Sequence, residues 1–197
     1  MELFREFFKI GTMHILDWRH GYDHILFVVA LCAVYVVADW KRILILVTAF
    51  TIGHSITLAL ATLRVISFNS SLIEFLIPLT ILITAISNLF QSENRIYERN
   101  IHLNYLFASF FGLIHGLGFS NNLRDILGSS GNIASPLLAF NLGLELGQII
   151  IVGIFMVLSF VAVDLMGLKR RDWKMIISSA IAGMALILIK ESAYLNS

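Results

Sequence analysis

The chain has 197 residues, of which 58% are hydrophobic and only 14% charged, and its mean hydropathy is +0.84. Soluble domains carry about 25% charged residues, so this composition argues against a water-soluble protein. The formal net charge of +1 gives no basic surface for nucleic acid. The single cysteine, Cys32, excludes a disulfide or a cysteine-type zinc site within the chain. We expect an all-α membrane protein with one polytopic domain over residues 1–197, in contact with the lipid bilayer.

Uncharged runs predict the membrane-spanning helices, since a helix needs about 20 residues to cross about 30 Å of hydrocarbon. Before them, MELFREFFKIG carries charges and lacks the apolar core of a signal peptide. We interpret it as a short amphipathic segment on the membrane surface, or as the start of a mature chain whose signal has been removed. A compact bundle of six spans follows, near residues 13–38, 43–64, 72–91, 103–120, 136–163 and 174–193.

The first span is the informative one. Only 14 residues, Ile25 to Ala38, are uncharged before the next charged side chain. At a rise of about 1.5 Å per residue they cover about 21 Å, which is too short to cross alone. The helix should therefore extend backwards through RHGYDH, which places Asp23 and His24 inside the bundle or at its rim.

Lysine and arginine cluster in alternate loops, which predicts the orientation of the chain. The loops after the first, third and fifth spans contain Lys41, Arg42, Arg95, Arg99, Lys169, Arg170, Arg171 and Lys174. We expect these loops to be cytoplasmic and both termini to be periplasmic.

Small and hydroxyl side chains form stripes that predict helix contacts. Thr80, Thr84, Ser87 and Asn88 lie on one helical face and favour packing over ligand binding. The glycine pairs 112/116 and 143/147 have the spacing of close helix–helix contacts.

Ionisable residues within apolar spans are harder to explain by packing, because each costs several kcal/mol in hydrocarbon without a partner. Four predicted helices carry them, at Asp23 and His24, His54, His115, and Glu145. Imidazole with carboxylate suits zinc, nickel, cobalt or iron. The sequence therefore favours an intramembrane transition-metal site over a proton relay or a structural ion-pair network. The expected ligands are His14, Asp23, His24, His54, His115 and Glu145; Asn141, Gln148, Thr51 and Ser55 are expected to orient them. For His20 the sequence leaves open whether it is a ligand or a residue at the rim of the bundle.

Four motifs, HILDWRHGYDHILFVVAL, VTAFTIGHSITLALA, FFGLIHGLGFS and FNLGLELGQ, resemble in that order the motifs of the HupE/UreJ family, most closely its second branch. The resemblance implies a multi-pass protein of the bacterial inner membrane, associated with nickel through hydrogenase and urease maturation. It implies a nickel or cobalt permease or a metal-accessory protein, with maturation proteins or further copies of the chain as candidate partners. The family motif positions correspond to His14, Asp23, His24, His54, His115, Glu145 and Gln148.

Two alternatives use the same residues. An intramembrane zinc-dependent hydrolase needs three protein ligands and a water, with Glu145 or Asp23 as general base. A proton relay or a structural role needs no metal. The sequence leaves the metal identity, nickel, zinc or cobalt, and the choice between transporter and enzyme open.

Overall fold

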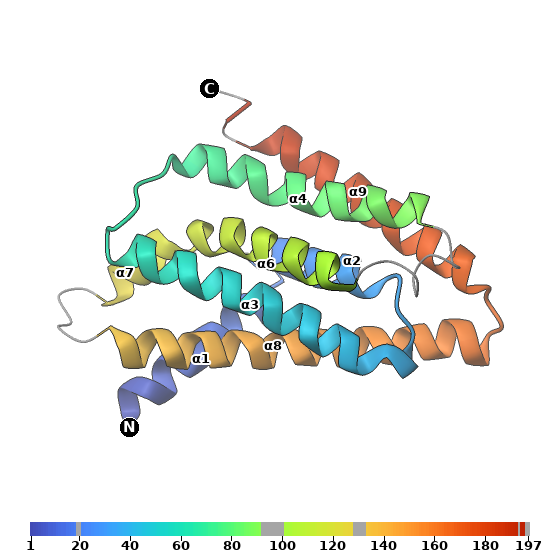
Figure 1. Cartoon of the computed structure of the whole chain (residues 1–197), viewed down its shortest axis with the longest axis horizontal. Helices are drawn as coiled ribbons and strands as arrows, with labels where there is room; N and C mark the ends of the chain where they lie inside the picture. Colours follow the sequence, from blue (N-terminus) through green and yellow to red (C-terminus); the bar gives the residue numbers. More distant parts are fainter. Residues whose placement is uncertain (19–20, 92–100, 128–132, 193, 196–197) are drawn as a thin grey trace.

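The protein is described by a computed structural model that covers residues 1–18, 21–91, 101–127, 133–192 and 194–195, with side chains omitted at 101–103. Within these ranges every regular element is helical (Figure 1). The helices are α1 (Glu2–Leu16), α2 (Tyr22–Cys32), η1 (Val37–Asp39), α3 (Trp40–Thr62), α4 (Ser70–Phe90), α6 (Ile101–Gly118), α7 (Ser120–Leu127), α8 (Ala134–Phe160), the π-helical η2 (Val161–Leu165) and α9 (Arg170–Glu191).

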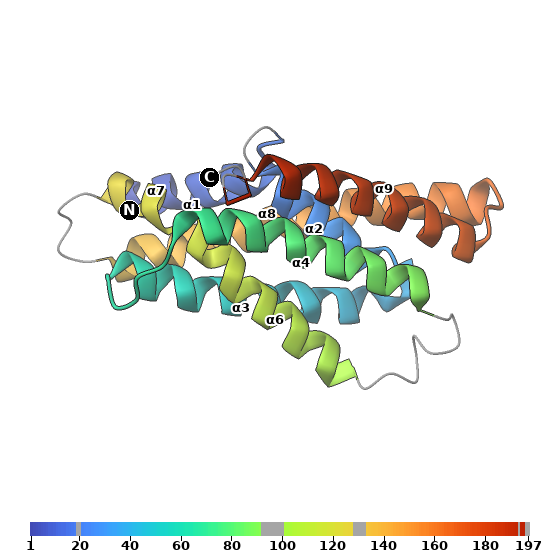
Figure 2. The ribbon, with the colours of Figure 1, turned by 90° about the horizontal axis from the view of Figure 1, so that it is seen from above.

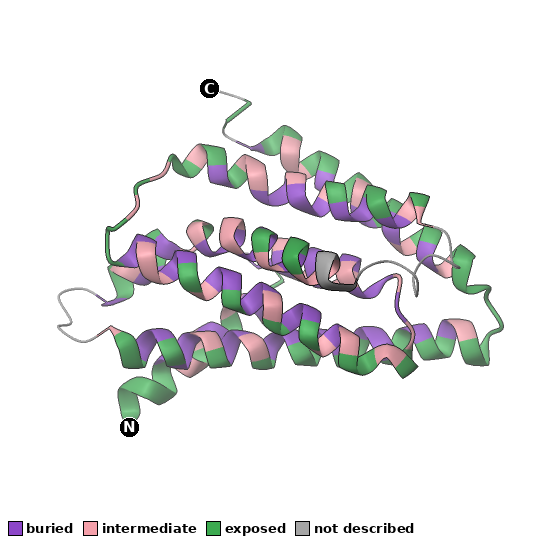
Figure 3. Cartoon of the chain, in the orientation of Figure 1, coloured by how far each residue is buried: buried purple, intermediate pink, exposed green. Residues whose placement is uncertain are grey.

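Four stretches in the described part of the chain are long and apolar enough to cross a membrane: Val37–Thr62, Ser70–Phe90, Ala134–Leu165 and Arg170–Glu191. They lie where four of the six spans are expected, and α6 lies at a fifth. Side chains on the outer faces of these helices are largely exposed in the isolated chain (Figure 3). Because these exposed side chains are mostly apolar, the outer surface suits lipid. The chain is a multi-pass, all-α membrane protein.

The structure differs from the prediction over residues 13–38, where two shorter helices replace one span. Helix α1 ends at Leu16 because the next residue, Asp17, has an extended backbone. Gly21 then caps the start of α2, and its α-carbon lies so close to the carbonyl of His14 that a side chain would clash. With 15 and 11 residues, α1 and α2 are about 22 and 16 Å long, so neither crosses hydrocarbon alone. The prediction of a single span over residues 13–38 was wrong because the length argument assumed an uninterrupted helix.

Glycines allow α3 and α6 to approach closely. A Cβ atom at Gly112 would meet the Phe50 carbonyl, and one at Gly116 would meet the His54 carbonyl. The predicted close contact of the 112/116 pair is therefore confirmed. This contact places His54 of α3 alongside the segment of α6 that carries His115.

Helix α1 packs against α8 in the same way and does not lie alone on the membrane surface. A Cβ at Gly11 would meet the Phe140 carbonyl, and one at Gly143 would meet the Phe8 carbonyl. The 143/147 pair is thus also confirmed as a close contact. Thr12 reinforces it by donating a hydrogen bond to the Gly143 carbonyl (3.1 Å).

Helix α2 lies in the middle of the bundle and contacts α1, α3, α4, α8 and α9 (Figures 1 and 2). Helix α7 and the N-terminus lie at one end of the bundle, and α9 runs toward it; we call it the α7 end. The other end, where α3 and α9 begin, carries Lys41, Arg42, Arg170 and Arg171 and is called the basic end. Of the other predicted loop cations, Arg95 and Arg99 lie outside the described residues.

Candidate metal centre

Three histidines from three helices meet in the interior. His14 lies in the last turn of α1, His24 in the first turn of α2, and His54 in α3. One ring nitrogen of each lies within 4.8 Å of the other two. Nitrogens that share one tetrahedral zinc ion lie about 3.3 Å apart, given zinc–nitrogen bonds of about 2.0 Å. Small side-chain movements would therefore close this set, called the histidine triad below, onto one ion.

The helix break found above brings His14 and His24 together. The chain turns between α1 and α2, and the His14 and His24 ring centroids lie 4.9 Å apart. His54 comes from the facing helix α3, with its ring centroid 5.9 Å from that of His24. A continuous helix would separate residues 14 and 24 by about 15 Å along its axis. The break therefore makes the triad geometrically feasible.

Asp23 is hydrogen-bonded to His24, one of the three histidines of the triad. Its carboxylate oxygen Oδ1 lies 2.9 Å from His24 Nδ1 and accepts a bond from the His24 backbone nitrogen at 2.8 Å. A carboxylate can only accept, so Nδ1 of a neutral His24 carries the proton and Nε2 carries the lone pair. Metal-binding histidines are commonly oriented by such a carboxylate. These hydrogen bonds put Asp23 where it can orient His24, and its role as a direct ligand stays a prediction.

His115 lies directly beside the triad, with its ring centroid 5.2 Å from that of His24. The Thr80 hydroxyl donates its one proton to the Ile77 carbonyl (2.7 Å), so its oxygen accepts from Nε2 of His115 (3.1 Å). In this tautomer the lone pair of His115 lies on Nδ1. His115 is fully buried, so this lone pair is held inside the bundle next to His24.

Five imidazole nitrogens at this site are buried without a hydrogen-bond partner among the described residues: His14 Nε2, His24 Nε2, His54 Nδ1 and Nε2, and His115 Nδ1. An unsatisfied buried polar group costs about 1–3 kcal/mol. Aromatic rings next to the histidines leave little room for other polar partners of these nitrogens. The ring centroid of Phe119 lies 4.0 Å from that of His14, and the Phe140 ring stacks on His54 at 6.5 Å, centroid to centroid. The donor set fits a transition metal, since imidazole without thiolate is a ligand type for zinc, copper, iron and nickel.

Glu145, a predicted ligand, is not part of the histidine triad. It accepts a hydrogen bond from Thr48 of α3 (2.7 Å) and is half-buried. One turn further along α8, Gln148 bonds in the same way to Thr51 (2.7 Å). The two pairs therefore cross-link α3 and α8 on the side of the histidines that faces the basic end.

The other residues expected to orient ligands have separate positions. Asn141 lies beside His54 while donating a hydrogen bond to the Leu137 carbonyl (2.9 Å). Ser55 donates to the Thr51 carbonyl of its own helix (2.7 Å). His20 lies outside the described residues.

A cavity of about 430 Å³ reaches the site from the α7 end. Its wall contains His14, His24 and His115 together with three carboxylates: Asp23, Glu74 and Glu191. His54 does not line it and lies deeper. The sequence analysis assigned neither Glu74 nor Glu191 to the site. The alternating directions of the predicted spans could have indicated both residues, because they put the start of α4 and the last turn of α9 on the same side of the bundle as His14.

This fold and site define a polytopic helical membrane protein with histidines gathered inside its helix bundle. The HupE / UreJ protein family model matches residues 1–193, and the chain belongs to this family. The resemblance found in the four sequence motifs is thereby confirmed. No curated protein and no solved structure matches the chain.

Proposed function

We propose that the protein binds a divalent transition metal at His14, His24 and His54 and carries it across the membrane. The observation that supports this most is the triad itself: three imidazoles from separate helices, each with a buried, unpaired nitrogen, within 4.8 Å of one another. Nickel and cobalt are the first candidates because of the HupE/UreJ family, and zinc is the third. An isolated imidazole triad leaves coordination positions open, which suits an ion that must be released.

The two half-length helices support transport. Transporters commonly place their substrate where membrane helices are interrupted, and here His14 and His24 lie at the ends of α1 and α2 that face each other. The cavity supplies an aqueous approach. Its three carboxylates would raise the local concentration of cations and exclude anions.

We propose the bacterial inner membrane as the location, with the basic end in the cytoplasm. Lys41, Arg42, Arg170 and Arg171 at that end follow the positive-inside rule. Both termini and the acidic cavity would then face the periplasm, so that the triad takes its cation from outside the cell. Further copies of the chain, or metalloenzyme-maturation proteins, remain candidate partners.

Metal binding to purified protein in detergent tests the proposal. Calorimetry and elemental analysis with nickel, cobalt and zinc should show binding to the wild type and its loss in His54→Gln and His24→Gln. Influx into liposomes containing a trapped metal indicator should fall in the same variants. If the wild type binds none of the three metals, the proposal is wrong. Full function in His54→Gln and His115→Gln would instead favour a proton relay or a structural role.

An intramembrane zinc hydrolase is the second candidate, and the cavity is the observation that favours it. A volume of about 430 Å³ beside His14 and His24 is large enough for water and part of a substrate. Asp23 is engaged with His24, and Glu145 does not line the cavity, so Glu74 or Glu191 would be better placed as general base. The hydrolase would be favoured if the wild type held zinc tightly and if Glu74→Gln and Glu191→Gln lost hydrolysis but kept the zinc.

A further inference from the structure

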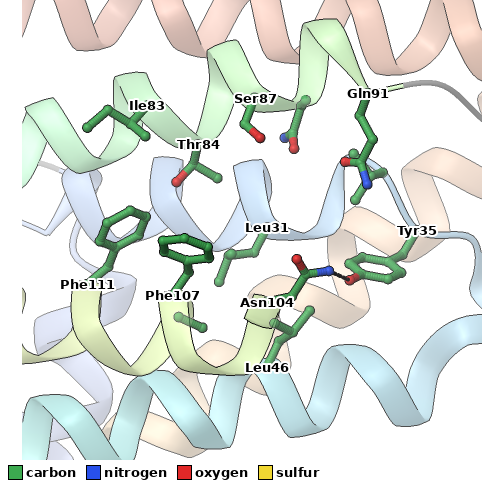
Figure 4. A pocket seen from close by; sticks show the side chains of 13 residues that line it. Leu31, Tyr35, Leu46, Ile83, Thr84, Ser87, Gln91, Asn104, Phe107 and Phe111 are labelled. Carbon is green, nitrogen blue, oxygen red and sulfur yellow. Dashed lines mark hydrogen bonds between the residues drawn. The ribbon is translucent and has the colours of Figure 1, made fainter. Parts of the chain in front are cut away.

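A second hollow lies between α2, α4 and α6 on the other side of His115. It has a volume of about 150 Å³ and shares no lining residue with the cavity at the α7 end. Figure 4 shows Thr84 and Ser87 of α4 facing Asn104 and Phe107 of α6 across it, with Leu31 of α2 behind. Gln91 and Tyr35 line it toward the basic end.

Little protein separates the two spaces. On α6 the cavity reaches His115 and the hollow reaches Phe111, a separation of about 6 Å along the helix. On α4 the corresponding residues are Pro78 and Ile83, about 7 Å apart. The barrier is therefore between one and two helical turns thick.

The barrier includes the rings of Phe27 and Phe111 and one polar pair. The Phe27 ring lies 5.0 Å from His115 and 5.9 Å from Phe111, centroid to centroid. The hydrogen-bonded side chains of Thr80 and His115 lie beside them. A route between the two spaces would pass these side chains, with His115 at the junction.

The lining of the hollow suits a cation that is leaving. All thirteen residues around it are uncharged, and six of them carry side-chain oxygen or nitrogen: Tyr35, Thr84, Ser87, Asn88, Gln91 and Asn104. Its volume has room for several water molecules. Neutral oxygen donors and water solvate a divalent cation without holding it tightly, which conduction requires.

We propose that this hollow is the inner half of the cation route. A partly hydrated divalent cation passes from the histidine triad, past His115 and Thr80, into the hollow, and leaves at the basic end. The inference rests on the proposed transport function and extends it, because it assigns a path, a barrier and a release site. It also gives the polar stripe of α4 a role beyond helix packing.

Cysteine substitution tests the route after the protein has folded. The only native cysteine, Cys32, is buried, so wild-type protein is an unreactive background. Thr84→Cys and Asn104→Cys place thiols in the hollow from its two walls, at a buried and a half-buried position. Ile86→Cys and Leu106→Cys are matched controls, since both positions are exposed neighbours outside the hollow. Each variant is reconstituted in liposomes, treated with a water-soluble cationic methanethiosulfonate, and assayed for nickel and cobalt influx.

We expect modification of Thr84→Cys and Asn104→Cys to abolish influx, while calorimetry shows unchanged metal binding at the triad. The two controls and the wild type should keep their influx after treatment. If the hollow thiols do not react, or react without loss of influx, the route is overturned. Equal loss in the controls overturns it as well, because the reagent would then act from the lipid face. Failure of the proposed function is a separate result: the untreated wild type would bind no metal.

Discussion

The Asp23 carboxylate accepts two hydrogen bonds from the single neighbouring residue His24, one from its ring nitrogen Nδ1 (2.9 Å) and one from its backbone (2.8 Å). This double contact fixes both the rotamer and the tautomer of the imidazole. It leaves the imidazole lone pair on Nε2, where it is available to a metal ion.

Asp23→Asn should weaken metal binding without abolishing it. Loss of a carboxylate that orients a ligating histidine typically reduces metal affinity about 10–100-fold, whereas His24→Gln removes the ligand itself. Calorimetric titration with nickel would measure both variants. Asp164→Asn, at an exposed position in η2, is the control and should bind like the wild type. Equal losses in Asp23→Asn and His24→Gln would show that Asp23 itself is a ligand.

Gly143, at the contact between α1 and α8, should be as important for metal binding as a metal-ligating residue is. In Gly143→Ala the new methyl group would meet the backbone carbonyl of Phe8 and separate the two helices. Because α1 carries His14, we expect both a lower thermal midpoint in detergent and a weaker affinity for nickel.

Gly153→Ala on the same helix is the matched control, because nothing lies within 4 Å of its added methyl group. It should be neutral or slightly stabilising, since alanine is the better helix former by about 1 kcal/mol. If Gly143→Ala behaved like Gly153→Ala, the close packing of α1 on α8 would not be what positions His14.

Most of the helical framework could be predicted from the sequence because hydrocarbon thickness imposes a simple length rule. Uncharged runs of 18 or more residues coincide with α3, α4 and α8, and the glycine pairs anticipated the close contacts of α6 and α8. The break between α1 and α2 could not be predicted in this way. It depends on the backbone of Asp17 and on the contact of Gly21 with the His14 carbonyl, neither of which has a periodic signal.

The candidate site could be predicted as a set of residues but not as a geometry. Histidines in apolar spans indicated the interior of the bundle, and the structure brings His14, His24 and His54 together. The partner of Glu145 is a matter of helix rotation. Whether its carboxylate meets Thr48 or the histidines depends on the rotation of α8 about its axis, which a pattern of residues on one helical face does not fix.

Thr80→Val should destabilise the protein by removing the acceptor for His115. The Nε2–H of His115 would be buried without a partner, which costs about 1–3 kcal/mol. Thr84→Val is the matched control one turn away, because the Thr84 hydroxyl bonds only to a backbone carbonyl of its own helix, that of Thr80 (2.8 Å). We expect the thermal midpoint in detergent to fall clearly for Thr80→Val and little for Thr84→Val. A shift of equal size in both would mean that the bond to His115 contributes nothing specific.

Metal binding should raise the stability of the fold, because the histidine triad joins three helices that are separate in the unfolded chain. A ligand that binds only the folded state stabilises it by about 2.7 kcal/mol at 100 times its dissociation constant. Nickel or cobalt should therefore raise the thermal midpoint of the wild type in detergent, and a chelator should reverse the shift. Magnesium should have no such effect, since it prefers oxygen ligands. His54→Gln should lose the shift, because only two of the three imidazoles remain. A shift that persists in His54→Gln would locate the bound metal elsewhere, with the carboxylates Glu74 and Glu191 of the cavity as the first place to search.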